Sequence, residues 1–233
     1  MLCTSGELYP NREDYYYFWL AYTTFLMFSI ASIVVAQISL CIYFVSINLS
    51  KFEVVCYHLE RLREMSDQSD ENDPNEIEKI VKHTCANHYE TLNFFRLFQI
   101  FSRNVLAFLS TYVFVALSTT GTMILYAFKI KNTFLILEMI VSFLCILCFA
   151  FLMGHIGQIL CNASDNLFYQ SYFCGWYNLP KESKKILHMM MTRCLTPCEL
   201  QSAPLSFMKF NYENFNAVVN TSISYMTVIA SVM

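Results

Sequence analysis

Residues 211–233 read NYENFNAVVNTSISYMTVIASVM, and this stretch guides how the rest of the chain is interpreted. From Asn214 onward it contains no charged residue, and about 20 residues suffice to cross a bilayer as a helix. Polar residues recur in it at the three- and four-residue intervals that place them on one helical face. Because lipid cannot hydrogen-bond them, they must meet another helix or water, so the stretch predicts either helix pairing or an aqueous pore wall. This polar ladder consists of Asn216, Asn220, Ser224, Thr227 and Ser231.

The composition predicts an all-α, polytopic bundle of membrane-spanning helices. Hydrophobic residues make up 56% of the 233 residues and charged residues 14%, against roughly 45–50% and about 25% in soluble proteins. A soluble domain could not bury so much apolar surface. The net charge of -3 argues against nucleic acid as a partner and leaves membrane lipid as the surroundings.

Four apolar segments alternate with polar ones along the chain. Residues 15–50 contain no charged residue and begin with a cluster of aromatic side chains, which is typical of a membrane interface. We expect the polar segments to form helical extensions of the bundle. The predicted order is a lead at 1–14, span one in 15–50 (about 18–47), a polar segment at 51–98, span two in 99–128 (about 104–128), a hairpin at 129–133, span three at 134–160, a polar segment at 161–209 and span four at 210–233.

Prolines and caps mark where helices begin in the polar segments. Asp73 can cap a helix whose first position is Pro74 and whose third is Glu76, so we expect a helix from about 75 that continues into span two. The second polar segment predicts two helical stretches, about 163–177 and 181–195, separated by Pro180.

The distribution of Lys and Arg predicts the orientation. Residues 51–103 hold seven of these cations and residues 161–209 hold five, whereas the lead and the hairpin together hold three. Because cations favour the cytoplasmic side, both polar segments are expected in the cytoplasm and both ends of the chain outside.

No arrangement of residues points to covalent chemistry, so we expect neither an enzyme nor a cofactor. The sequence lacks a glycine-rich phosphate loop and an HExxH motif. Cys194, Cys198 and His188 match no standard zinc spacing, and we expect no metal. Glu138 and His155 are ionisable groups near the ends of span three, where they predict either interfacial or helix-pairing contacts, or a proton relay.

Several motifs resemble the insect odorant receptors. HYETLNFFRLFQIFS at 88–102, with Tyr89 where Gln is usual, and GHIGQILCNASDNLFYQSYFCGWY at 154–177 are similar to segments beside that family's fifth and sixth spans. The resemblance covers about 15–233. Its C-terminal signature consists of Trp176, Pro180, the KKILHMMMTR run at 184–193, Pro197, Phe215 and SISYMTVI at 222–229.

The resemblance implies a topology and an assembly. Family members have seven spans and a cytoplasmic N-terminus, so the four spans here correspond to the last four, with the orientation that the Lys and Arg count predicts independently. Three spans are then expected to be missing, as in a truncated gene model, an isoform or a decayed copy. In the family, four subunits, one kind being a shared co-receptor, surround a cation pore in the plasma membrane of olfactory sensory neurons.

The resemblance also assigns roles to residues of this chain. The last span lines the pore, with Val228 at the hydrophobic gate, Ser224 and Ser231 beside it, and Asn220 and Thr227 on the same wall. The odorant would bind an apolar cavity between spans. Residues implied for the cytoplasmic anchor and the bend before the pore helix are Trp176, Pro180, Phe207 and Phe215. Residues expected from depth and periodicity to line the odorant cavity are Tyr22, Phe25, Leu26 and Ser29 of span one and Met139, Ser142, Phe143 and Ile146 of span three.

Two functions of different classes follow as expectations. The first is a subunit of an odorant-gated, non-selective cation channel that detects small volatile molecules in olfaction. The alternative is a non-conducting remnant or accessory subunit that packs with full-length receptors, and conductance separates the two.

Overall fold

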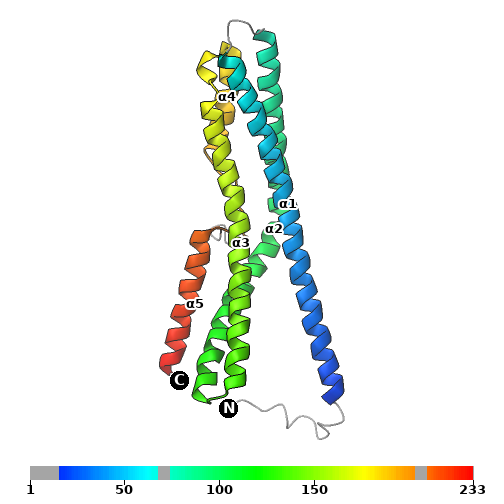
Figure 1. Cartoon of the computed structure of the whole chain (residues 1–233), viewed down its shortest axis with the longest axis vertical. Coiled ribbons are helices and arrows are strands. Elements are labelled where there is room, and N and C mark those ends of the chain that lie inside the picture. Colours follow the sequence, from blue (N-terminus) through cyan, green and yellow to red (C-terminus); the bar gives the residue numbers. More distant parts are fainter. Residues whose placement is uncertain (1–15, 68–73, 203–208, 233) are drawn as a thin grey trace. The chain divides into compact units, whose positions relative to one another are not determined.

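A computed structural model describes residues 16–67, 74–202 and 209–232 of the chain. The described chain is built from helices joined by short connections, with a single isolated β-bridge between Gln201 and Lys209 (Figure 1). The predicted all-α fold is therefore confirmed. The elements are α1 (Tyr16–Asp67), α2 (Pro74–Lys129), α3 (Thr133–Phe173), the 3-10 helix η1 (Trp176–Asn178), α4 (Lys181–Cys194) and α5 (Tyr212–Val232).

The chain divides into two compact units, Met1–Tyr43 and Phe44–Met233. In the first unit, the described structure is the start of α1. Its aromatic residues are largely exposed, as the apolar surface of a membrane helix is, and the rings of Trp19 and Tyr22 meet edge to face at 6.0 Å between centroids. The rest of α1, from Phe44 onward, and all the later helices belong to the second unit.

Local signals explain where the second unit's helices begin and turn. Helix α2 begins at Pro74, with Glu76 in its first turn, and continues unbroken to Lys129. The chain then reverses within three residues: Lys131 adopts φ 54°, and the side chain of Asn132 caps α3 by accepting a hydrogen bond from the Leu135 amide at 3.2 Å. The tight hairpin predicted at 129–133 is present in the structure.

The helix predicted at about 163–177 is not a separate element. Helix α3 continues from the apolar segment through Phe173 without a break, because no proline or glycine interrupts residues 158–173. It ends at Phe173, and Gly175, two residues later, has a φ of 74° in the left-handed region that favours glycine after a helix. Helix α4 follows Pro180 and ends at Cys194, close to the expected 181–195.

The polar segments form a compact core that we call the anchor bundle. Its buried residues recur at alternating intervals of three and four along each helix, which is the heptad pattern of coiled-coil packing. Aromatic contacts join α1 and α2, with Phe44 stacked on Phe98 at 5.0 Å. The buried positions are Val45, Asn48, Phe52, Val55, Leu59, Leu62 and Ser66 of α1; Ile77, Val81, Thr84, His88, Thr91, Phe95 and Phe98 of α2; Leu160, Ser164, Leu167 and Ser171 of α3; and Ser183, Leu187, Met190, Met191 and Cys194 of α4.

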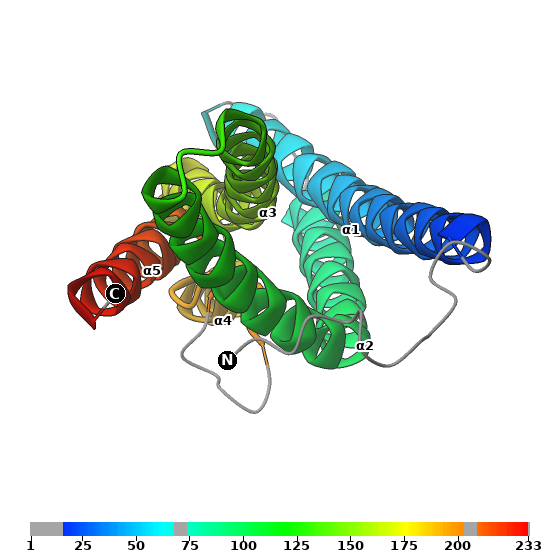
Figure 2. The same cartoon turned by 90° about the horizontal axis from the view of Figure 1, so that it is seen from below.

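Three helical stretches are long and apolar enough to cross a membrane: Ala21–Ser66, Asn75–Lys129 and Thr133–Asn178. The most apolar part of the third has no buried residue within the described chain, so its surface is available to lipid or to other subunits. Helix α5 lies alongside α2 and α3 (Figures 1 and 2). It is not among the three stretches, and its crossing of the membrane stays a prediction.

Candidate pore helix and its attachment

Helix α5 has one packed face. Ser222 is only 4% exposed, and Met226 is half-buried against Gly121 of α2, where the absence of a side chain makes room for the thioether. The ring of the preceding residue, Tyr225, meets the ring of Phe114 of α2 edge to face at 5.5 Å between centroids. These contacts fix which side of α5 faces the rest of the chain.

The polar ladder lies on the opposite face. Successive residues of an α-helix are rotated by about 100°, so Asn220 lies about 160° around the helix from Ser222. All five ladder residues are exposed in the structure, and Val228, beside the ladder, is 62% exposed. The ladder therefore does not pair α5 with the other described helices of the second unit.

The hydroxyl groups of the ladder donate their protons to the helix that carries them. Ser224, Thr227 and Ser231 donate to backbone carbonyls three or four residues earlier, at 2.7–2.9 Å. Each hydroxyl oxygen then presents its lone pairs outward. A wall of oxygen acceptors is suited to hydrated cations rather than to anions.

Aromatic side chains surround the start of α5. The phenol of Tyr212 and Nδ1 of His155 on α3 are joined by a hydrogen bond of 2.5 Å. Phe151 stacks on His155 at 6.0 Å and meets Phe215 edge to face at 5.7 Å. The His155 contact is of the helix-pairing kind. Glu138 is exposed, and its backbone carbonyl accepts a hydrogen bond from Ser142.

Two glycines of α3 form a seat for the chain that enters α5. A Cβ atom at Gly157 would overlap the carbonyl oxygen of Phe210 and lie 2.9 Å from its carbonyl carbon. A Cβ atom at Gly154 would lie 3.3 Å from the carbonyl oxygen of Asn211, which is tight but tolerable. Backbone thus packs on backbone at this glycine seat, the closest approach that two chain segments can make.

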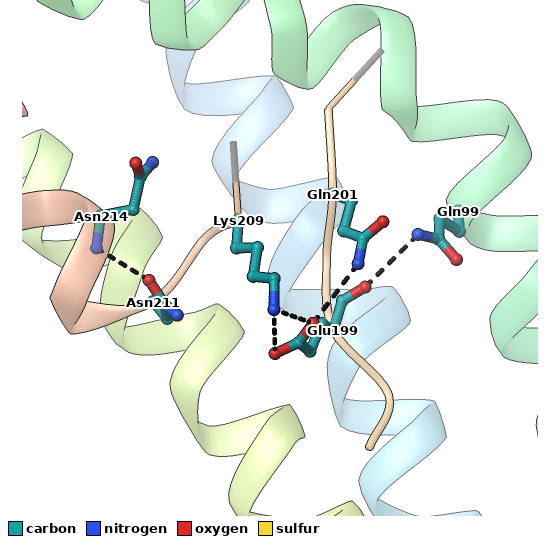
Figure 3. Close-up of polar contacts among 6 residues, drawn as sticks. All are labelled: Gln99, Glu199, Gln201, Lys209, Asn211 and Asn214. Carbon is teal, nitrogen blue, oxygen red and sulfur yellow. Dashed lines mark hydrogen bonds and ion pairs between the residues drawn. The ribbon is translucent and has the colours of Figure 1, made fainter. Parts of the chain in front are cut away.

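A polar clasp holds the same segment from the other side (Figure 3). The ammonium group of Lys209 contacts both carboxylate oxygens of Glu199, at 2.7 and 3.0 Å. Gln201 donates to the same carboxylate at 3.3 Å, and Gln99 of α2 donates to the Glu199 carbonyl at 3.4 Å. The hydrogen bond to the Glu199 carboxylate raises the pKa of the Lys209 ammonium, so the lysine stays charged. The backbone of 199–201 and 209–211 runs antiparallel here.

A cavity of about 40 Å³ lies where α2, α3 and the start of α5 meet. That volume has room for a few water molecules. Its wall is mostly apolar, with the polar groups at one end. The lining residues are Leu109, Ser110, Val113, Ala150, Met153, Gly154, Lys209, Phe210, Asn211, Asn214, Phe215 and Val218.

The residues implied for the anchor lie in different places. Trp176 belongs to η1, Pro180 precedes α4, and Phe215 lies in the first turns of α5 against Phe151. Phe207 lies outside the described residues. Their roles in an anchor stay predictions.

A sulfur-rich cluster occupies the centre of the anchor bundle. The thiol of Cys194 lies 3.5 Å from Nε2 of His88, and Cys85 lies 3.8 Å from the Met190 sulfur. Burial raises the pKa of Cys194 to about 12 and lowers that of His88 to about 4, so both groups are neutral. Among the residues that the structure describes, no three His, Cys, Asp or Glu side chains gather closely enough to hold a metal ion.

The residues expected to line the odorant cavity divide between the two units. Tyr22, Phe25, Leu26 and Ser29 belong to the first unit, where the first three are exposed. The expected residues of α3 belong to the second unit and are half-exposed, and none of the eight lines the cavity described above. Their role in odorant binding stays a prediction. The α3 residues are Met139, Ser142, Phe143 and Ile146.

Sequence reasoning missed the glycine seat and the clasp. A signal for the seat was present in GHIG at 154–157, because glycines three residues apart share a helical face. The clasp had no such signal. Glu199 and Lys209 meet only because the chain reverses between them.

The comparisons with known proteins agree with this architecture. The chain matches the family model described as "7tm Odorant receptor" over residues 6–223, which leaves Ser224, Thr227, Val228 and Ser231 beyond the matched range. No protein with a curated description matches. The family is one of membrane receptors and not of enzymes, and the helical fold with three membrane-length apolar helices fits it. Since the match spans most of the 233 residues, the chain belongs to the odorant receptor family.

Proposed function

We propose that the chain is a subunit of an odorant-gated, non-selective cation channel, and that α5 lines the pore. The observation that carries the proposal is the position of the polar ladder, on the face of α5 opposite Ser222 and exposed throughout. In lipid, a face of this kind costs free energy unless it meets water or a neighbouring subunit. Several subunits that turn this face inward would enclose a column of water.

The same geometry supports Val228 as the gate. Val228 projects beside Ser224 and Ser231, so a ring of valines would interrupt the ring of oxygen acceptors. A narrow apolar ring empties of water and blocks ions when the pore closes. A small volatile ligand that binds one arrangement of the helices more tightly than the other would shift the pore between closed and open states.

The family match supports a proposal for the surroundings of the subunit. We propose assembly with a co-receptor subunit into a tetramer, in the plasma membrane of olfactory sensory neurons. The polar segments lie in the cytoplasm and both ends of the chain outside, as the Lys and Arg distribution favours. The odorant site uses the cavity residues predicted from span one and span three.

Cysteine accessibility tests whether α5 lines the pore. With the co-receptor present, Ser224→Cys places a thiol on the ladder and Ser222→Cys places one on the packed face. We expect a water-soluble, positively charged thiol reagent to reduce odour-evoked current in the first variant and to spare the second and the parent chain. Equal modification of both variants, or of neither, in conducting cells would contradict the assignment.

A further inference from the structure

The chain enters α5 through three consecutive residues that are held on two sides. Phe210 and Asn211 pack on the glycine seat of α3, and Lys209 is bound by the clasp. The amide of Phe210 also donates to the carbonyl of Leu200 at 2.9 Å. Further along α5, the contacts to α2 are made by side chains such as Met226 and Tyr225.

The clasp is rooted in the anchor bundle. Leu200 and Cys198 are almost fully buried. The backbone amide of Cys198 is held in place because it donates a hydrogen bond to the hydroxyl of Ser164 on α3 at 3.1 Å. Gln99 ties the Glu199 carbonyl to α2 (Figure 3). A displacement of the bundle therefore carries residues 198–201 with it, and the clasp passes that displacement to Lys209.

The stiffness of the attachment differs along α5. At the seat, backbone meets backbone, and a change of position there produces overlap at once. At Gly121 the partner is the end of a Met side chain, which has three rotatable bonds and adapts to movement. A helix held stiffly at its start and softly along its length pivots about the start.

We propose that Gly157, Glu199 and Lys209 are positioning residues for the pore helix: they form the pivot through which the anchor bundle sets the tilt of α5. The inference rests on the proposed function, because only a pore makes the tilt of α5 matter for conduction. The pivot itself can be measured without any current.

Matched glycine variants test the seat. Gly157→Ala and Gly154→Ala make the same chemical change on the same face of α3, and both favour the helix that carries them. They differ in how closely the new methyl group meets backbone: it overlaps the Phe210 carbonyl in the first case, and it makes a tight contact of 3.3 Å with the Asn211 carbonyl oxygen in the second. Hydrogen exchange, followed by mass spectrometry on the full chain in detergent, reports the protection of the amides of residues 210–215.

We expect Gly157→Ala to raise the exchange rate of these amides at least about tenfold, and Gly154→Ala to change it less than about threefold. Wild-type exchange in Gly157→Ala, or an equal rise in both variants, would overturn the seat as the pivot. If Gly157→Ala does not fold, variants of the clasp residues Glu199 and Lys209 test the pivot instead.

Charge reversal at the two ends of the ion pair tests the clasp, with the same hydrogen-exchange measurement. Glu199→Lys and Lys209→Glu each place two like charges together, and the double variant restores an opposite pair with its ends exchanged. We expect each single change to raise exchange at 210–215 severalfold and the double variant to return it to within about twofold of wild type. If the amide exchange rate in the double variant rises by the combined effects of the two single changes, the clasp is overturned.

The two failures are distinguishable. Loss of protection in Gly157→Ala, together with an absence of odour-evoked current in the wild-type assembly, would support the pivot and contradict the channel. Normal evoked current in variants that have lost protection would support the channel and overturn the positioning role of the pivot.

Discussion

Val228 and Ser222 lie six residues apart on α5 and have opposite surroundings. The valine is 62% exposed, whereas the serine is 4% exposed and donates to the Val218 carbonyl at 2.8 Å. An exposed apolar side chain on the ladder side contributes little to the packing of this chain. Its exposure fits a contact with other copies of itself around a pore axis.

Replacing Val228 by alanine is expected to raise the current that flows without odorant. The smaller side chain widens the apolar ring and makes it easier to wet. Val218→Ala makes the same change on the packed face and is expected to leave this leak unchanged. Whole-cell recording of basal current and of relative cation permeability decides the matter, and identical values in Val228→Ala and wild type would show that the gate lies elsewhere.

His88 gives the anchor bundle a dependence on pH. Burial lowers its pKa in the folded state from 6.5 to about 4, and the side chain is 5% exposed. The folded state disfavours the protonated imidazole. The contribution of neutral His88 to the free energy of unfolding is therefore complete above pH 6.5 and is lost as the pH falls from 6.5 towards 4. Between pH 7 and pH 5 the loss amounts to about 2 kcal/mol.

Thermal unfolding in detergent between pH 7 and pH 5 measures this loss. We expect His88→Gln to flatten the fall in the unfolding midpoint, whereas His188→Gln, at an exposed position of α4, leaves it as in the wild type. An unchanged pH dependence in His88→Gln would mean that another group titrates.

At the scale of the elements, the anchor bundle is held by its heptad positions. Leu59 is fully buried, and Leu62, one turn later on the same side of α1, is as well. The apolar part of α2 keeps a stripe of buried residues through Leu106, Val113 and Leu117, whereas the most apolar part of α3 has no buried residue within the described chain. The bundle is therefore the part of the second unit whose stability depends most on this chain's own packing.

Truncation of a heptad residue is expected to weaken the bundle. Leu59→Ala should lower the free energy of unfolding by about 2–5 kcal/mol, because it removes buried methyl groups and leaves a cavity. Leu195→Ala is the matched control, since Leu195 is 63% exposed just beyond α4, and a change below about 0.5 kcal/mol is expected. Chemical unfolding followed by circular dichroism compares them, and equal effects would contradict the packing described.

The sequence allowed the elements to be predicted where the signal was local. Pro74 and Glu76 marked the start of α2, and the short charged turn after Lys129 marked the hairpin. The uninterrupted course of α3 was missed because the polar residues after Asn162 suggested a new element, although they only move the same helix out of the apolar region.

The candidate site was predictable in part. The spacing of the ladder was visible, but its exposure required knowledge of which face packs on α2 and α3. The clasp and the seat depend on chain segments that meet after folding, and no periodicity within one helix reports such a contact.

At the scale of the whole molecule, the account depends on orientation. The Lys and Arg distribution favours cytoplasmic polar segments, so the acidic stretch SDQSDENDP at 66–74 should be out of reach from outside. A protease that cleaves after acidic residues, added to intact cells, is expected to leave it uncut and to cut it after permeabilisation. Cleavage within 66–74 on intact cells would show that the topology is inverted.

The central claim is that the chain contributes to an odorant-gated cation pore, and one recording tests it most directly. Cells that express the chain together with the family's co-receptor are compared with cells that express the co-receptor alone, over a broad panel of volatile compounds. The account predicts an additional odour-evoked, non-selective cation current that Ser224→Cys makes sensitive to a charged thiol reagent. Surface expression of the assembly with no current beyond that of the co-receptor would contradict it and favour an accessory, non-conducting subunit.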